Sequence, residues 1–249
     1  EMISRLLNSF MTQRWEELLL LHWPIDQSKL KHSLPSDLKA DLFDGSAWIS
    51  VVGFKLTQLR ISPFRWIPWA DFWEINLRTY VMDQNGKKGV WFYSLDSSDL
   101  FAVAGARLLY GLPYNFAEAS GEYDSGKLAF QSNRRFPHQR ATSNFEASFS
   151  QVQNEENIAK SSLDQFLLER YRFWSPRKLS NQSTFAQIKH PPYDAVNTKS
   201  ARYEGELFKS QGLDEPKIVP MLGHYCKGFN VQATAPSWAF SIAGQANQR

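Results

Sequence analysis

Cysteine is nearly absent from this chain of 249 residues, and histidine is scarce. Cys226 is the single cysteine, so neither an intrachain disulfide nor a cage of cysteines around a metal can form. The five histidines are never spaced as ligands on one face of a helix, and the zinc-binding pattern His-Glu-x-x-His does not occur. The glycine-rich motifs that bind nucleotides are also missing. We therefore expect no metal site and no cofactor.

Long apolar runs and concentrated charge are missing as well. No apolar segment approaches the roughly 20 residues that cross a bilayer, and polar residues interrupt the N-terminal stretch every few positions. The net charge is only +3, and its local cluster of Arg134, Arg135 and Arg140 is typical of a solvated loop. These features predict a cytoplasmic protein with no nucleic-acid or membrane partner, and they leave the oligomeric state open.

Aromatic residues, by contrast, make up 14% of the chain, and they favour the pleated, half-buried surfaces of β-sheets. Segments that alternate between apolar and polar residues are separated by turn signals such as Asn85-Gly86. The expected fold is mainly β (α+β), with an antiparallel β-barrel-like core, closed or nearly closed, and a few peripheral helices. No linker forces a division, so residues 1–249 are predicted to be a single domain, with a leading helix over residues 1–14 and the core over residues 15–249.

The segment DFWEINLRTYV, residues 71–81, carries the first candidate site. At the period of a strand, one of its faces is apolar and the other carries Glu74, Asn76, Arg78 and Tyr80. This polar face either meets water, as one side of many antiparallel sheets does, or lines the inside of a barrel. An arginine with a carboxylate and an amide suits a small polar molecule, in particular an anion. If Glu74 and Arg78 mainly neutralise each other, the row is a structural ion pair instead.

Two further segments carry candidate residues. The pattern predicts a helix over residues 98–110, capped by Ser98, in which Arg107 lies in the apolar stripe; we expect Arg107 either to meet a carboxylate or ligand, or to extend to the surface. Tyr114 and Asn115 follow where this helix ends and a loop could enter a cavity. In the segment HPPY, two prolines stiffen a loop that holds His190 and Tyr193, a pair that can serve a site or simply form a turn.

Six motifs between about Trp15 and the tail form a combined pattern: LHWPID, FWEINLRTYV, GVWFYSLDSSD, ARLLYGLPY, FLLERYRFW and HPPY. Together they resemble the YqjF-like family of uncharacterised bacterial proteins. That family resembles the acetoacetate decarboxylase superfamily in fold, a β-barrel-like core with an internal cavity and peripheral helices. The resemblance implies that Glu74, Asn76 and Arg78 point inward.

The acetoacetate decarboxylases carry the segment G-R-E-x-x-G-x-P-K-K, whose first lysine forms a Schiff base with the substrate while the second lowers its pKa. The similar stretch here is GARLLYGLPYN, in which Gly105, Gly111 and Pro113 match and the lysines are replaced by Tyr114 and Asn115. Because a phenol or an amide cannot form an imine, the resemblance excludes decarboxylation by that route. Glu74 matches the strand carboxylate of the decarboxylases, which implies that the cavity persists without the Schiff-base chemistry.

The main functional hypothesis is a polar cavity that binds or acts on a small carboxylate or carbonyl compound. If the protein is an enzyme, it is lyase-like or an acid/base enzyme without a covalent lysine. The catalytic candidates are Glu74, Tyr114 and His190. The ligand-binding candidates are Asn76, Arg78, Arg107, Asn115 and Tyr193.

The alternative hypothesis is a non-enzymatic interaction module. The segment SPFRWIPWADFW holds Trp66, Trp69 and Trp73, which could dock a partner or a membrane surface if they are exposed together. Otherwise these side chains form a lid or the edge of the core. The sequence does not decide between an enzyme and a binding protein.

Overall fold

A computed structural model of the chain describes residues 9–150, 160–176 and 183–239. Within these residues, twelve strands form one sheet, and three α-helices and a 3-10 turn accompany it. The strands are β1 (Met11–Ile25), β2 (Leu38–Ala40), β3 (Ala47–Ile61), β4 (Phe72–Asp83), β5 (Lys88–Ser97), β6 (Tyr114–Asp124), β7 (Lys127–Phe136), β8 (Thr142–Phe149), β9 (Arg172–Pro176), β10 (Ser183–Lys189), β11 (Ala195–Gly205) and β12 (Leu222–Ala233). The helical elements are α2 (Gln27–Leu30), α3 (Leu100–Tyr110), α4 (Ser162–Leu168) and η1 (Lys209–Gln211).

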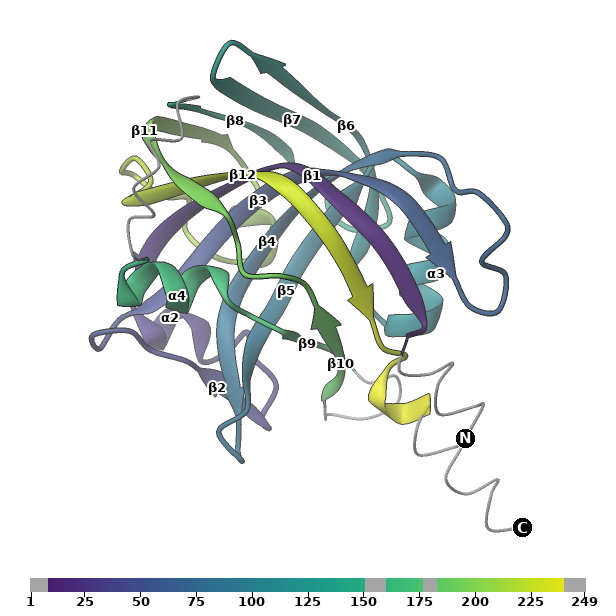
Figure 1. The fold of residues 1–249 in the computed structure, drawn as a ribbon. Helices are drawn as coiled ribbons and strands as arrows, with labels where there is room; N and C mark the ends of the chain where they lie inside the picture. The colour runs from purple at the N-terminus through teal and green to yellow at the C-terminus, as the bar shows by residue number, and fades with distance from the viewer. Residues whose placement is uncertain (1–8, 151–159, 177–182, 240–249) are drawn as a thin grey trace.

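Strand pairing closes this sheet twice. β4 pairs with β5, which closes a barrel in the order β5-β6-β7-β8-β11-β12-β1-β3-β4. β9 pairs with β5, and β10 pairs with both β9 and β12, which closes a second ring in the order β5-β9-β10-β12-β1-β3-β4. The strands common to both rings cross the middle of the molecule in Figure 1, between β6, β7 and β8 above and α4, β9 and β10 below.

The shared strands separate two hydrophobic cores. The helix-side core contains side chains from α3, α4, β9 and β10, and the hairpin-side core contains side chains from β7 and β8. Leu18 and Leu20 belong to the helix-side core, whereas Leu19 and Leu21 belong to the hairpin-side core, and all four are completely buried. Because successive side chains of a strand point to opposite faces, the four consecutive leucines of β1 show that both of its faces are buried.

Local sequence determines where α3 begins and ends. The predicted cap, Ser98, is wrong: the carboxylate of Asp99 accepts the N–H of Ala102, and the Ser98 hydroxyl accepts the N–H of Trp73. Either residue type can cap a helix, but only Asp99 directly precedes the first helical residue. Gly111 ends the helix with φ of 67°, in the left-handed region that glycine adopts without strain.

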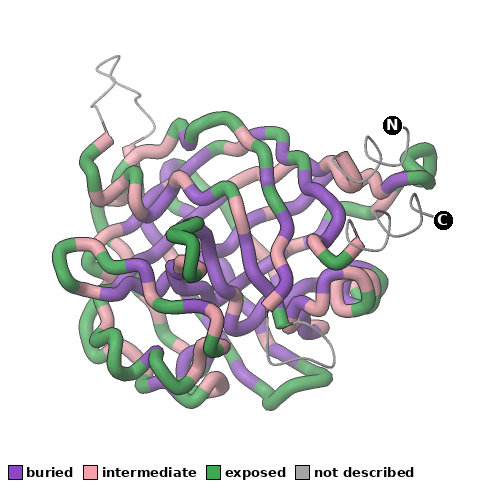
Figure 2. The backbone as a smooth tube through the Cα atoms, turned by 90° about the horizontal axis from the view of Figure 1, so that it is seen from below, coloured by how far each residue is buried: buried purple, intermediate pink, exposed green. Residues whose placement is uncertain are grey.

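The mainly β, barrel-like fold with peripheral helices is confirmed. The leading helix over residues 1–14 is wrong where the structure describes it, because Met11 already pairs with Ile61 of β3 and Ala233 of β12. Pairing on both edges outweighs the helical pattern of this segment. Residues 1–8 lie outside the described residues, and the single-domain organisation stays a prediction. In Figure 2 most of the buried segments lie in the middle of the molecule and most of the exposed segments lie along its edge.

Candidate functional site

Glu74 and Tyr114 meet on the helix-side face of the sheet. In the pairing of β4, β5 and β6, Asn76 lies opposite Leu95, and Leu95 lies opposite Tyr114. The Tyr114 hydroxyl donates to Glu74 Oε2 at 2.5 Å, and Asn76 Nδ2 donates to Glu74 Oε1 at 3.2 Å. Both carboxylate oxygens of Glu74 are therefore fixed by neighbouring side chains.

The environment of Glu74 changes its acidity. Burial raises the pKa of Glu74 from its ordinary value of 4.5 to about 7, although the hydrogen bonds from Tyr114 and Asn76 and the charge of Arg78 act in the opposite direction. Burial, together with the adjacent Glu74 carboxylate, raises the pKa of the Tyr114 hydroxyl well above 10. Near pH 7, Glu74 is therefore divided between its acid and base forms, while Tyr114 stays a neutral donor. This combination suits proton exchange.

Glu74 and Tyr114 form the polar end of a cavity of about 100 Å³. Its other walls are largely apolar and come from β1, β3, β5 and α3, with Trp15, Phe54 and Leu95 among the lining residues. Phe101 lines the cavity and is also 75% exposed, so the cavity reaches the surface beside α3. Since about 10–15 Å³ is the least space that admits one water, the cavity has room for a small molecule. No lysine or arginine is found in this lining within the described residues.

The predicted arginines lie outside this lining. Arg78 is buried further along β4, and within the described residues no ion pair joins it to Glu74 or to another carboxylate. The hypothesis of a Glu74–Arg78 ion pair is therefore wrong. Half-buried Arg107 donates from Nη1 to the backbone oxygen of Tyr114 at 2.7 Å. This carbonyl takes the place of the carboxylate that we expected to meet Arg107.

Asn115 does not share a cavity with Tyr114. Consecutive residues of β6 face opposite sides of the sheet, so the side chain of Asn115 lies on the hairpin side. There its amide donates to Asp96 Oδ1 at 3.3 Å, and its oxygen lies 2.7 Å from Nδ1 of His138. Asp96 in turn accepts from Arg134 Nε at 2.6 Å, and both side chains are completely buried. The two residues predicted to act together thus belong to different cores.

His190 and Tyr193 also lie outside the cavity lining. The His190 ring stacks on Tyr171 and Phe229, with ring centroids at 4.5 and 5.1 Å. Tyr193 is buried against Phe229, and burial raises the pKa of its hydroxyl, which lies within reach of the Arg78 charge. The stiff HPPY loop therefore packs against the helix-side core, and a direct role in a site stays a prediction.

Sequence reasoning missed a buried polar chain on the helix side. Nδ1 of His22 lies 2.7 Å from the Ser50 hydroxyl, and its Nε2 lies 3.0 Å from Nδ1 of His224. His224 Nε2 lies 2.9 Å from Asp164 Oδ1, and the Ser50 hydroxyl lies 2.8 Å from that of Tyr80. The available signal was the position of His22, which alternates with buried Leu18 and Leu20. Its partner, 202 residues away in the chain, had no local signature.

Lowering the pH from 7 to 5 should change the contributions of His22 and Glu74 to stability in opposite directions. Burial, His224 and Arg78 hold the pKa of His22 well below 6.5, so the unfolded chain takes up a proton there that the folded chain does not, and the free energy of unfolding falls. The pKa of Glu74 is about 7 when folded, so its contribution is complete below about 4.5 and is lost as the pH rises through 7. Acidification over this range therefore strengthens the contribution of Glu74.

Denaturant unfolding at pH 5, 6 and 7 measures both effects. Compared with the wild type, Glu74→Gln should lose more stability on acidification, and His22→Gln should lose less. The remaining titrating groups are common to all three proteins, so they cancel in the comparison. Identical pH slopes for the three proteins would contradict the assignment of these pKa shifts.

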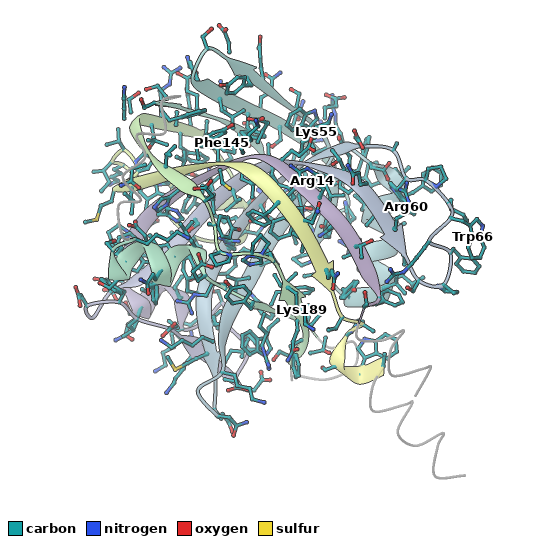
Figure 3. All side chains as sticks on the ribbon, in the orientation of Figure 1. Arg14, Lys55, Arg60, Trp66, Phe145 and Lys189 are labelled. Carbon is teal, nitrogen blue, oxygen red and sulfur yellow. The ribbon has the colours of Figure 1, made fainter. Side chains whose placement is uncertain are left out.

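Trp66 and Trp69 of the β3–β4 loop and Trp73 at the start of β4 do not form one exposed patch. Trp66 is 73% exposed and points away from the molecule at the tip of the loop (Figure 3). Trp69 lines the cavity, and Trp73 packs against Phe130 in the hairpin-side core. The position of Trp69 agrees with the hypothesis that these side chains form a lid or the edge of the core. Only Trp66 and its exposed neighbours are available to dock a partner. Separately, no helix among the described residues is long and apolar enough to span a membrane.

The doubly closed sheet, with a buried carboxylate in an internal cavity, defines a protein of the acetoacetate decarboxylase-like fold. The enduracididine biosynthesis enzyme MppR complexed with pyruvate matches with a TM-score of 0.62 and 10% identity, covering 91% of this chain and 89% of that one. The acetoacetate decarboxylase of Legionella pneumophila matches with a TM-score of 0.57 and 14% identity, covering 93% and 89%. An acetoacetate decarboxylase-like enzyme from Sphingomonas wittichii also has a TM-score of 0.57, with 13% identity and coverage of 93% and 94%. At these identities the likeness shows the fold alone.

Sequence comparison identifies the family. The DUF2071 family, described as an uncharacterized conserved protein, matches residues 12–230. The uncharacterized protein YqjF of Bacillus subtilis is 36% identical over 218 residues, which are 87% of each chain. The protein belongs to the DUF2071 family. The resemblance to YqjF-like proteins is therefore confirmed.

Proposed function

We propose that this protein binds a small carbonyl compound with an apolar body, that Glu74 exchanges protons with it, and that Tyr114 donates a hydrogen bond to its oxygen. The observation that supports this most is the pairing of a buried carboxylate with a phenol in the lining of a largely apolar cavity, in which Gln13 is a further polar side chain. The apolar walls favour a hydrocarbon body, and the polar end favours one oxygen-bearing group. Since the lining contains no cation among the described residues, a carbonyl suits this cavity better than a carboxylate.

The proposed chemistry is acid/base and non-covalent. The base form of Glu74 removes a proton from the carbon next to the carbonyl, and the electron pair moves to the carbonyl oxygen. Once Glu74 is protonated, the Tyr114 hydroxyl turns from Glu74 Oε2 to the enolate oxygen and stabilises it with a hydrogen bond. Glu74 exchanges the proton it has taken for a deuteron from the solvent and returns that deuteron to the carbon, so the net result in D₂O is the replacement of hydrogen by deuterium. No lysine lines the cavity within the described residues, which agrees with a route that forms no imine.

Structural neighbours support the carbonyl class by analogy. MppR is described in complex with pyruvate, and also with the condensation product of pyruvate and imidazole 4-carboxaldehyde. Both complexes derive from small carbonyl compounds held by a similar fold.

Deuterium exchange followed by NMR tests the proposal. Acetone, 2-butanone, cyclopentanone and pyruvate are each incubated with the protein in D₂O at pD near 7. We expect faster exchange of the α-hydrogens of at least one ketone, and a loss of about 10²-fold or more in Glu74→Gln, the usual scale for removing a general base. Tyr114→Phe should retain part of the activity, because it removes only the hydrogen bond to the enolate.

Two further variants test whether the exchange takes place in the cavity rather than at a carboxylate elsewhere on the protein. Glu118 is exposed and pairs with Arg135, so Glu118→Gln should leave the exchange unchanged. Gly105 lines the cavity, and a Cβ placed there meets nothing within 4 Å, so we expect Gly105→Leu to narrow the cavity while leaving the Glu74 carboxylate in place. Exchange that survives both Glu74→Gln and Gly105→Leu would refute the proposal.

The alternative function, docking of a partner or a membrane, has less support. It rests on the exposed side chains of Phe64, Trp66 and Ile67 in the β3–β4 loop. Because Trp69 and Trp73 contribute to the cavity and the hairpin-side core, only part of the predicted aromatic surface is available. We therefore favour the cavity function.

A further inference from the structure

Arg78 is a buried cation with unused donors. It lies on β4, on the helix-side face, and is only 7% exposed. Its Nε and Nη2 atoms are buried and have no hydrogen-bond partner in the part of the chain that the structure describes. Among the described residues no carboxylate lies within ion-pair distance of it. A guanidinium carries its charge at every pH at which proteins are folded, so this charge needs another source of compensation.

The groups around Arg78 do not supply that compensation. His22 on β1 is held neutral near pH 7, because burial and neighbouring positive groups keep its pKa well below 6.5. Tyr193, before β11, is also neutral, because burial raises the pKa of its hydroxyl. Glu74, on the same strand, has a pKa of about 7 and is therefore only partly ionised.

Two further buried or half-buried carboxylates have partners of their own. Asp164 at α4 binds His224, and Asp41 binds both Arg170 and Lys88. The aromatic ring of Tyr80 lies 6.0 Å from the Arg78 guanidinium carbon, which is a weak contact. The residues paired with Arg78 on the neighbouring strands, Ser50 on β3 and Phe92 on β5, carry no charge either.

The two unused donors have a specific geometry. Nε and the Nη2 nitrogen share one edge of the planar guanidinium, where their N–H bonds run parallel. This edge matches the two oxygens of a planar oxyanion and binds them through two hydrogen bonds. A spherical anion such as chloride cannot align with both bonds in the same way.

We propose that Arg78 binds a planar oxyanion, the carboxylate of a small organic acid or bicarbonate, within the helix-side core. The site is distinct from the cavity that Glu74 and Tyr114 line, because Arg78 is not part of that lining. The two sites are nevertheless linked through charge. Arg78 lowers the pKa of Glu74, so a bound anion offsets this effect and favours the protonated form of Glu74.

Thermal unfolding in the presence of anions tests the site. The sodium salts of formate, acetate, bicarbonate, nitrate and chloride are compared at constant ionic strength and pH 7. We expect a saturable rise in the melting temperature with the planar oxyanions and none with chloride. The anion that saturates at the lowest concentration distinguishes an organic carboxylate from bicarbonate.

Three variants assign the effect to Arg78. Arg78→Met removes the unpaired charge, which should leave the protein folded, and should abolish the response to anions. Should that variant fail to fold, Arg78→Lys keeps the charge without the paired N–H edge, and at least a tenfold loss of affinity for formate is expected. Arg107→Met serves as the control and should respond like the wild type.

The result is independent of the proposed carbonyl function, because Glu74→Gln should keep the anion response while losing deuterium exchange. Equal stabilisation by chloride and formate, an unchanged response in the Arg78 variants, or no saturable response in the wild type would each overturn the oxyanion site.

Discussion

Replacing Arg134 by leucine is expected to lower the free energy of unfolding by about 3–5 kcal/mol, the range for removing one partner of a buried ion pair. Arg134 Nε and Asp96 Oδ1 are 2.6 Å apart, and both side chains are completely buried. Burial raises the pKa of Asp96, and the charge and hydrogen bond of Arg134 act against that rise. Without Arg134, the Asp96 carboxylate either stays charged in the hairpin-side core without its partner or takes up a proton. Both outcomes favour the unfolded chain.

The adjacent residue supplies a matched control. Arg135 binds Glu118 at 2.6 Å, but these side chains are 39% and 60% exposed. Arg135→Leu should therefore change the free energy of unfolding by less than about 1 kcal/mol. Urea unfolding of both variants gives the comparison, and equal effects would show that the buried position of the Arg134 pair has no special weight. Adding Asp96→Asn to Arg134→Leu should recover part of the loss, because the unpaired charge is removed.

Leu19→Ala and Leu20→Ala are each expected to cost about 2–5 kcal/mol, although the two residues are adjacent on β1. In a strand with one face in water, only one of two neighbours would have this effect. Here Leu19 contributes to the hairpin-side core and Leu20 to the helix-side core, and neither is exposed. Each truncation leaves a cavity in a different core.

Guanidinium unfolding of the two leucine variants measures these losses. Leu108, which is 71% exposed on α3, is the control for the chemical change, and Leu108→Ala should stay within about 0.5 kcal/mol of the wild type. A small effect for either Leu19 or Leu20 would mean that β1 has a solvent-exposed face and that the second ring of strands does not close around it.

Period-two alternation placed Glu74, Asn76 and Arg78 on one side of the strand over residues 71–81, but it left open whether that side meets water or faces inward. The resemblance to the YqjF-like family predicted the inward side, and these side chains are indeed buried. The same rule separates Tyr114 from Asn115, since neighbours on a strand face opposite sides, but their resemblance to the paired lysines of the decarboxylases led us to treat them as one group. For Tyr114 and Asn115, the alternation of a strand was thus a better guide than the resemblance to the lysine pair.

Other features had no local signal. The second ring closes through pairs such as Ile188 with Ala233, and such contacts depend on the whole sheet rather than on either segment. The meeting of His22 and His224 has the same origin. The position of Arg78 outside the cavity was also not predictable, because alternation fixes the side of the sheet but not the depth along the strand. Side-chain packing within the helix-side core determines that depth.

The double closure of the sheet also bears on how this family could diversify. Both faces of the shared strands are buried, so substitutions on them disturb one core or the other, and we expect these strands to stay constant beneath the cavity. Trp69 in the β3–β4 loop and Phe101 and Gly105 in α3 line the cavity from elements outside both rings. Because these residues lie outside the strands that close the rings, substitutions or loop exchanges there should change which molecules fit the cavity without altering the barrel.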